Sequence, residues 1–289
     1  MKNIILIGGT GQLGGSFPAE REGYAFISPT RAECDITKPE TLERLIATHH
    51  AVGVINTSGF HVLPQCEENP EEAFQINCIA VRNMAVVAKK HKAWFVTFSS
   101  DYIFDGEGTK PYTETDAPCP IQMYGISKCA GEFAARAVYP DGTYIIRTSG
   151  LYGGASGSAS RGGNFVTKML EEAKKNSTIE VSSEQIKSPS YAPHVAEATM
   201  KLVFKSMPPG VYHIVNSGLC SWADFTKEIF KVWSLPAMVK PVDRRRDVVA
   251  FRRPRYSPLD GSKAERLGVT MPTWQEGLKA YHNYLFNLS

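Results

Sequence analysis

The chain has 289 residues, enough for one large α/β domain or for one domain with an appended lobe. Its 32 basic and 29 acidic residues give a net charge of +3, which provides no reason to expect nucleic acid or an anionic membrane as a partner. The apolar run from Ile4 to Ile7 is too short for a signal peptide or a membrane span, so we expect a cytoplasmic protein. The six cysteines and seven histidines form no CxxC or HExxH motif, and we expect free thiols and no metal site.

Short β-branched segments alternate with amphipathic ones through the first half of the chain. Strands are predicted at 3–7, 25–28, 52–56, 94–100 and 143–147, and helices at about 12–21, 39–48, 70–90 and 123–138. A capping box formed by Thr37 and Glu40 is expected to start the helix at 39–48. This alternation predicts an α/β protein with a Rossmann-type, doubly wound parallel sheet.

The pattern loosens in the second half. A Gly/Ser-rich loop at 153–163 precedes a helix to about 175, a strand at 179–182, a helix from about 193, a strand at 211–216, a helix at 221–233 and an irregular, Arg-rich tail. We predict an NAD(P)-binding domain over residues 1–150 and a smaller, mainly substrate-binding lobe over 151–289. Because the strand at 211–216 has the character of a buried sheet member, segments near 190–216 are expected to return to the main sheet.

The first chemical signal is GGTGQLGG, directly after the first strand. Gly8, Gly11 and Gly14 have a GxxGxxG spacing at a predicted strand-to-helix turn. Glycines there allow a tight turn and a close approach of the backbone to a pyrophosphate, which faces the N-terminus of the following helix. The loop therefore predicts a dinucleotide site, with Gly8, Gly11, Gln12 and Leu13 as contacts.

The end of the second strand bears on the choice of dinucleotide. An NAD site commonly has an acidic residue there, which binds the ribose 2′-hydroxyl. This chain has Thr30 and Arg31 instead, and a neutral residue followed by Arg suits a 2′-phosphate. We therefore expect NADPH and leave NADH open. Asp35 and Ile36 are expected to flank the adenine.

A hydroxyl group and a Tyr-x-x-x-Lys pair follow. Ser100 ends the strand at 94–100, at the edge of the sheet where ligands bind, and Tyr124 and Lys128 share one face of a predicted helix. A phenol with a pKa of about 10 needs a nearby cation to donate a proton near neutral pH. Lys128 can supply that charge and reach the nicotinamide ribose, while Ser100 donates a hydrogen bond to the developing oxyanion. These three residues are the predicted catalytic residues of a carbonyl reductase.

Several motifs extend nearly from end to end of the chain: GGTGQLG, CDIT, FSSDYIFDG, YGISKCAGE, IIRTSGLYG, GGNFVTKML, GVYHIVNSGLCSWADF and RRPRYS. With them the chain resembles the dTDP-4-dehydrorhamnose reductases of the extended short-chain dehydrogenase/reductase superfamily. The resemblance implies reduction of the C4 ketone of dTDP-4-dehydro-L-rhamnose to dTDP-L-rhamnose with NAD(P)H, a step of polysaccharide biosynthesis. It also implies a homodimer.

The resemblance also assigns substrate contacts. Ser100 and the Asp101 and Tyr102 that follow it match the family's catalytic hydroxyl segment, and Arg253, Tyr256 and Ser257 match its sugar-nucleotide-binding tail. An arginine such as Arg253 can bind a nucleotide diphosphate through paired hydrogen bonds.

Three departures from the family pattern concern segments that line its site. Gly150 stands where a Trp usually follows Arg-Thr-Ser. The loop after the third strand reads SGFHV at 58–62 where the family has Ala-Ala-Tyr/His-Thr, and we expect Ser58 and Gly59 beside the cofactor. The segment 184–190 reads EQIKSPS where the family has Asp-Gln-x-Gly-Ser-Pro-Thr, so that Lys187 replaces a glycine. A related nucleotide-4-ketosugar therefore stays open as the substrate.

Three other function classes stay open or lose support. A non-catalytic NADP-binding regulatory subunit is an alternative, although the intact Ser100, Tyr124 and Lys128 favour an enzyme. A 4,6-dehydratase would need paired acidic residues after Ser100, and Asp101 is followed by Tyr102. The basic cluster formed by Arg244–Arg246, Arg252, Arg253 and Arg255 is better explained by a diphosphate pocket than by nucleic acid.

Overall fold

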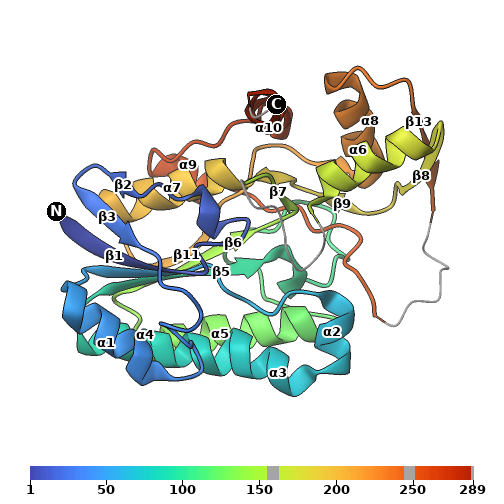
Figure 1. Cartoon of the computed structure of the whole chain (residues 1–289). Coiled ribbons are helices and arrows are strands. Elements are labelled where there is room, and N and C mark those ends of the chain that lie inside the picture. Colours follow the sequence, from blue (N-terminus) through green and yellow to red (C-terminus); the bar gives the residue numbers. More distant parts are fainter. Residues whose placement is uncertain (155–162, 244–250, 288–289) are drawn as a thin grey trace.

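The structure, a computed structural model, describes residues 1–154, 163–243 and 251–287. Its centre is a seven-stranded sheet with the order β11-β6-β5-β4-β1-β3-β2 (Figure 1). The strands are β1 (Lys2–Ile7), β2 (Glu20–Arg21), β3 (Tyr24–Ile27), β4 (Gly53–Asn56), β5 (Trp94–Ser100), β6 (Thr143–Thr148) and β11 (Gly210–His213). All neighbours pair in parallel except β2 and β3. The predicted parallel sheet of the first half is therefore confirmed.

Helices cover both faces of the sheet (Figure 1). On one face, α1 (Pro39–His49), α4 (Ala80–Lys90) and α5 (Met123–Val138) bury an apolar layer that includes Leu42, Met84 and Val54. The predicted helix at 70–90 is divided into α3 (Pro70–Phe74), a π-helical turn at Gln75–Ile79 and α4, and it is preceded by α2 (Leu63–Glu68). On the opposite face lies α7 (Ala192–Phe204).

The helix predicted at 12–21 is wrong. Only a 3-10 turn at Gly14–Ser16 (η1) follows the glycine loop, and the chain then forms β2. Two consecutive glycines and Pro18 explain this result, because Gly is costly in a helix interior and Pro cannot donate the backbone hydrogen bond there. Leu13 and Phe17 are still buried, in an apolar cluster that contains α7. A helix from the second half of the chain thus covers this face of the sheet.

The C-terminal lobe has its own core. It contains β7 (Leu151–Tyr152), α6 (Phe165–Lys175), β8 (Thr178–Ser182), β9 (Ile186–Lys187), β10 (Ser190–Tyr191), β12 (Cys220–Ser221) and α8 (Trp222–Val232). Buried aromatic side chains fill it, including Tyr152, Phe225, Trp274 and Tyr281. The prediction of an irregular, Arg-rich tail is wrong in part. The tail forms β13 (Met238–Val242), α9 (Ser262–Arg266) and α10 (Trp274–Phe286). The loop predicted at 153–163 lies mostly outside the described residues.

Two capping boxes can be compared at the starts of helices, one that forms and one that does not. A capping box at α10 joins Thr273 to the backbone of Glu276 and the Glu276 side chain to the backbone of Thr273. The T-x-x-E pattern in TWQE is typical of a capping box. The capping box predicted for Thr37 and Glu40 is wrong, because the Thr37 hydroxyl donates to the Asp35 carboxylate at 2.7 Å and α1 has no side-chain cap.

The second half of the chain contributes directly to the main sheet. β11 pairs with β6 over Gly210–His213, and the three segments β6, β11 and α7 lie in contact through a shared apolar cluster. The division of the chain at residue 150 stays a prediction.

Helix α5 docks closely on the loop after β5, at a glycine. A Cβ added to Gly125 would lie 2.1 Å from the carbonyl oxygen of Tyr102, which is far inside normal contact. Alanine is favoured over glycine in a helix by about 1 kcal/mol, but overpacking against backbone costs about 1–3 kcal/mol or more.

We therefore expect Gly125→Ala to lower the melting temperature by several degrees, measured by calorimetry. Gly261→Ala is the matched control, because a Cβ there would lie at an ordinary 3.6 Å from the His213 carbonyl oxygen. A Gly125→Ala protein that melts at or above the wild-type temperature would contradict the close docking.

Candidate functional site

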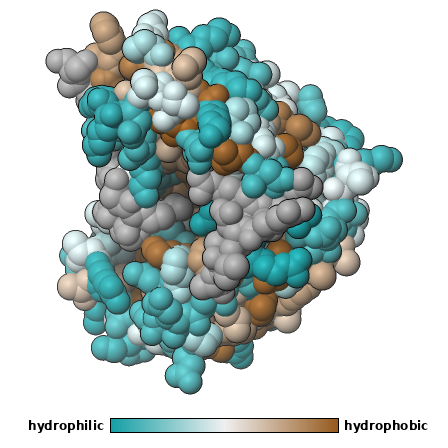
Figure 2. Space-filling view, turned by 90° about the vertical axis from the view of Figure 1, so that its right-hand side faces the viewer, coloured by the Kyte–Doolittle hydropathy of each residue, from teal (hydrophilic) through white to brown (hydrophobic). Residues whose placement is uncertain are grey.

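The predicted site residues gather at the carboxyl edge of the sheet. β3 lies on one side of β1 and β4 on the other, so the topological switch point falls between β1 and β4. Open α/β sheets bind their ligands in the crevice at this point. Figure 2 shows the molecule from the side toward which the strands point, and this face is hollowed between an upper and a lower part.

The glycine loop forms a tight turn at the end of β1. Gly8 has φ of +79°, and the Gly11 N–H donates to the Gly8 carbonyl oxygen at 2.9 Å. A Cβ at Gly14 would lie 2.1 Å from that carbonyl oxygen, so only glycine fits. Gln12 and Leu13 are buried beneath the turn, and a Cβ at Gly154 would lie 2.3 Å from the Gln12 carbonyl oxygen. The start of the C-terminal lobe therefore lies directly on the loop.

The segment after β3 offers a cation and no available carboxylate for the ribose. Arg31 is exposed and makes no ion pair within the described parts of the chain. The Glu33 carboxylate accepts hydrogen bonds from the Thr30 N–H at 2.7 Å and from its hydroxyl at 2.8 Å, and these bonds hold the pKa of Glu33 below its usual value. Asp35 is similarly engaged with Thr37, and Ile36 packs against the core.

Ser100, the first predicted catalytic residue, ends β5 and is buried. Its hydroxyl donates to Asp101 Oδ1 at 3.1 Å and accepts from the Tyr102 N–H at 3.2 Å. The Tyr102 ring meets the Tyr124 ring edge-on, with 5.9 Å between centroids. The structure thus brings the strand-end segment and the start of α5 together.

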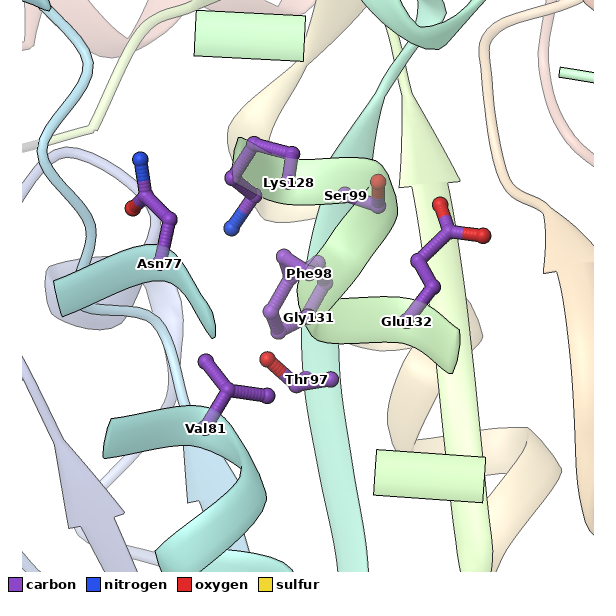
Figure 3. A pocket seen from close by; sticks show the side chains of 8 residues that line it. All are labelled: Asn77, Val81, Thr97, Phe98, Ser99, Lys128, Gly131 and Glu132. Carbon is purple, nitrogen blue, oxygen red and sulfur yellow. The ribbon is translucent and has the colours of Figure 1, made fainter. Parts of the chain in front are cut away.

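Tyr124 and Lys128 lie one turn apart on α5, as the sequence predicts. The Lys128 ammonium points into a cavity bordered by Asn77, Phe98 and Gly131 (Figure 3). A Cβ added to Gly59 would lie 3.8 Å from the Lys128 Nζ, which places the 58–59 loop beside that ammonium. The loop is fixed by a residue that the sequence analysis missed. Asn77, buried in the π-helical turn, accepts from the Phe60 N–H at 2.9 Å and donates to the Ser127 hydroxyl at 3.0 Å.

The electrostatic setting of Lys128 is unusual. It is buried, and among the described residues it has no hydrogen bond or ion pair. Burial lowers the pKa of Lys128 to about 8, against the opposite effect of the Glu132 carboxylate. Glu132 points away from the ammonium (Figure 3), and two nitrogens of Arg147 bind it, the nearer at 2.8 Å. Buried cations without a counter-ion are costly, and such groups concentrate at functional sites.

The substrate-side residues are connected by a second buried lysine. Lys187 Nζ donates to Asp101 Oδ2 at 2.5 Å and to the Ser257 hydroxyl at 3.1 Å, and it lies 4.3 Å from the centroid of the Tyr102 ring. The adjacent Tyr256 N–H donates to the Gly106 carbonyl oxygen at 3.1 Å. The RPRYS segment is therefore docked on the segment after β5. Lys187 was identified from the sequence only as a departure, and a lone lysine in a loop gives no further signal.

Two substrate candidates remain, Arg253 and Gly150. Arg253 is exposed, with its guanidinium 5.3 Å from the centroid of the Phe251 ring. Gly150 has φ of +54°, and a Cβ there would meet Pro189 Cα at 3.2 Å and Trp222 Cη2 at 3.4 Å. The indole of Trp222, from α8, therefore lies next to position 150, where the family pattern has a Trp. Arg244–Arg246 lie outside the described residues.

Metal binding, membrane spans and disulfides are three further features that the described residues bear on. Within residues 1–154, 163–243 and 251–287, no group of three His, Cys, Asp or Glu side chains could hold a metal ion. None of the helices in these ranges is long and apolar enough to cross a membrane. All six cysteines are free, and Cys119 is the exposed one.

Comparisons with known proteins agree with the geometry. The profile described as RmlD substrate binding domain matches residues 1–286. The chain is 35% identical to the spore coat polysaccharide biosynthesis protein SpsK of Bacillus subtilis, with 97% of each chain covered. It is 30% identical to the dTDP-4-dehydrorhamnose reductase of Escherichia coli, with 98% of each covered.

Solved structures give the same result. The dTDP-4-dehydrorhamnose reductase of Bacillus anthracis, solved in complex with NADP, superposes with a TM-score of 0.91 at 32% identity, covering 98% of this chain and 100% of that one. A UDP-glucose 4-epimerase of Thermotoga maritima, 20% identical, shares the fold with a TM-score of 0.77. The full-length profile match, the two relatives and the shared architecture lead to one conclusion: the chain belongs to the RmlD family, that of the dTDP-4-dehydrorhamnose reductases.

Proposed function

We propose that this protein is an NADPH-dependent reductase that converts the C4 ketone of dTDP-4-dehydro-L-rhamnose into the alcohol of dTDP-L-rhamnose. The observation that carries the proposal is the buried ammonium of Lys128, which has no partner among the described residues and lies one helical turn from Tyr124. A protein retains such a cation where a ligand or a reacting group uses it. A ribose hydroxyl and a phenol that must give up its proton both fit that use.

The residues present suit a dinucleotide. Close packing requires glycine in this turn, since a Cβ at Gly14 would lie 2.1 Å from the Gly8 carbonyl oxygen. A turn built from glycines lets the backbone approach a pyrophosphate closely. Arg31 is an exposed cation beyond β3 that has no ion pair in the part of the chain that the structure describes. It lies at the place where a 2′-phosphate would be bound, which favours NADPH over NADH. When bound, the reduced nicotinamide supplies a hydride to the ketone carbon.

The chain's own residues handle the proton. Tyr124 donates its phenolic proton to the ketone oxygen as negative charge develops there, and Lys128 stabilises the phenolate that results. Ser100, at the end of β5, donates a hydrogen bond to the same oxygen and holds the ketone in place. Tyr102, Arg253, Tyr256 and the surface near Gly150 are the proposed contacts of the sugar nucleotide. Asp101, predicted from the sequence as a further contact, is buried and acts through the Ser100 hydroxyl that is bonded to it.

The substrate is a nucleotide sugar, and two finer points are part of the proposal. The presence of Trp222 beside Gly150 alters the wall near the sugar, so a related nucleotide-6-deoxy-4-ketohexose is the alternative substrate. We further propose that the protein acts in the cytoplasm as a homodimer, which light scattering of the purified protein tests directly.

The first test is turnover. With dTDP-4-dehydro-L-rhamnose present, we expect the wild type to consume NADPH, followed by absorbance at 340 nm, and Tyr124→Phe to lose roughly 10²–10⁴-fold in kcat, because the proton donor is removed. Tyr139→Phe, at the end of the same helix, is the matched control and should retain full activity.

The outcome also separates two function classes. If NADPH binds tightly but the wild type turns over no nucleotide-ketosugar, the protein is a cofactor-binding regulatory subunit and the proposed reductase activity is wrong.

The second test is the pH profile. Because kcat/KM reports ionisations of the free enzyme, and the pKa of Lys128 is about 8, its ammonium is present below that pH and lost above it. We expect kcat/KM to be level from about pH 6 to 8 and then to fall by about tenfold per pH unit. A profile that stays level to pH 9.5 would exclude the Lys128 ammonium as a required charge.

The third test concerns the cofactor. Arg31→Ala should weaken NADPH binding by roughly 10- to 100-fold and leave NADH binding nearly unchanged, since only NADPH carries the 2′-phosphate. Arg44→Ala, which removes another exposed guanidinium, is the control. Titration of cofactor fluorescence measures both affinities, and equal losses for NADPH and NADH would place Arg31 outside the phosphate site.

A further inference from the structure

A buried ionic cluster lies directly behind Ser100. The Asp101 carboxylate accepts three hydrogen bonds: Oδ2 from Lys187 at 2.5 Å and from Ser257 at 2.6 Å, and Oδ1 from Ser100 at 3.1 Å. The side chains of Asp101 and Lys187 are 2% and 3% exposed, so water does not screen their interaction. The cluster therefore joins three segments of the chain: the end of β5, the loop at 184–190 and the RPRYS tail.

The cluster affects the direction in which the Ser100 hydroxyl donates its proton. A serine hydroxyl has one proton to donate, and the Ser100 proton is directed at Asp101. The Ser100 hydroxyl must turn away from that carboxylate before it can donate to a ketone oxygen. At 3.1 Å this bond is longer than an ordinary O–H···O bond of about 2.7–2.8 Å, whereas both bonds to Oδ2 are short. Oδ2, the oxygen bonded to Lys187 and Ser257, therefore makes the stronger hydrogen bonds of this carboxylate, and Oδ1 holds Ser100 more weakly.

We propose that Lys187 is a positioning residue of the reductase: by binding Asp101 Oδ2, it weakens the hold of Asp101 on the Ser100 hydroxyl and so leaves that proton available to the ketone oxygen. The inference rests on the proposed reductase function and deepens it. It also assigns a role to a residue that replaces a glycine in the resembled family pattern.

The charges around Lys187 keep it cationic. Burial alone would lower the pKa of Lys187, but Asp101 and Tyr102 raise it above its usual value, and Arg253 opposes them. At neutral pH the ammonium is therefore fully charged. Without it, Asp101 would be a buried anion whose remaining donors are two hydroxyls, and its hold on Ser100 would tighten.

The test is Lys187→Met, which keeps the length of the side chain and removes its charge. We expect kcat to fall by roughly tenfold or more with KM within about threefold of wild type, because the lost interaction is one made in the transition state. Asp101→Asn combined with Lys187→Met should recover most of the lost kcat, since an amide holds the Ser100 proton weakly. Lys240→Met breaks an exposed Lys–Glu pair between β13 and β8 and should change neither constant.

Two results would overturn the proposal. A rise in KM with kcat unchanged would mean that Lys187 only fastens the RPRYS tail, and a double variant as slow as Lys187→Met would mean that Asp101 does not restrain Ser100. If Lys187→Met does not fold, Lys187→Gln, which retains hydrogen-bond donors without the charge, takes its place with the same expectation for kcat.

Melting temperatures separate this inference from the proposed function. Lys187→Met and Asp101→Asn should each lower the melting temperature by about 5–10 °C, and the double variant should lose clearly less than the sum. That coupling supports the cluster without any substrate. No turnover by the wild type would overturn the reductase function alone, whereas strictly additive losses would overturn the cluster.

Discussion

The burial of the Lys128 ammonium is the constraint around which the site is organised. Its helix, α5, must approach β5 and the π-helical turn closely enough to exclude water, and glycines in α5 permit that approach. Gly131 faces the Asn77 carbonyl oxygen and Gly125 faces that of Tyr102, each at a distance that no Cβ could occupy. The same packing positions Tyr124 beside the end of β5. The packing of α5 on the sheet thus positions both the Lys128 ammonium in its cavity and the Tyr124 phenol.

The site contains two buried lysines with opposite electrostatic settings. Among the described residues, none forms an ion pair with Lys128, and burial lowers its pKa to about 8 against the opposite effect of Glu132. Lys187 has Asp101 within hydrogen-bonding distance, and the pKa of Lys187 is raised. The first can change its charge near neutral pH, and the second cannot. The site thus combines an ammonium that can lose its proton with one that keeps its charge beside Asp101 and Tyr102.

Sequence reasoning reached the parallel sheet, most helices and the Tyr124–Lys128 pair because each depends on local periodicity or on a short motif. It failed at 12–21, where the glycine motif predicts a helix but Gly15 and Pro18 prevent one. It also missed Asn77, which lies inside a helical pattern and whose partners Phe60 and Ser127 are 17 and 50 residues away in sequence. The Asp101–Lys187–Ser257 cluster joins positions 86 and 156 residues from Asp101. No local pattern could have revealed such pairings.

The position of α7 has a consequence for how the chain reaches its native state. Leu13, Phe17 and Phe26 lie in one apolar cluster with Val195, Met200 and Leu202 of α7, because no helix follows β1 to cover them. While the ribosome is still adding residues short of about 204, that side of the sheet is uncovered and open to aggregation. The first half of the chain is therefore not a self-sufficient folding unit, because the helix that covers this side of its sheet is synthesised much later.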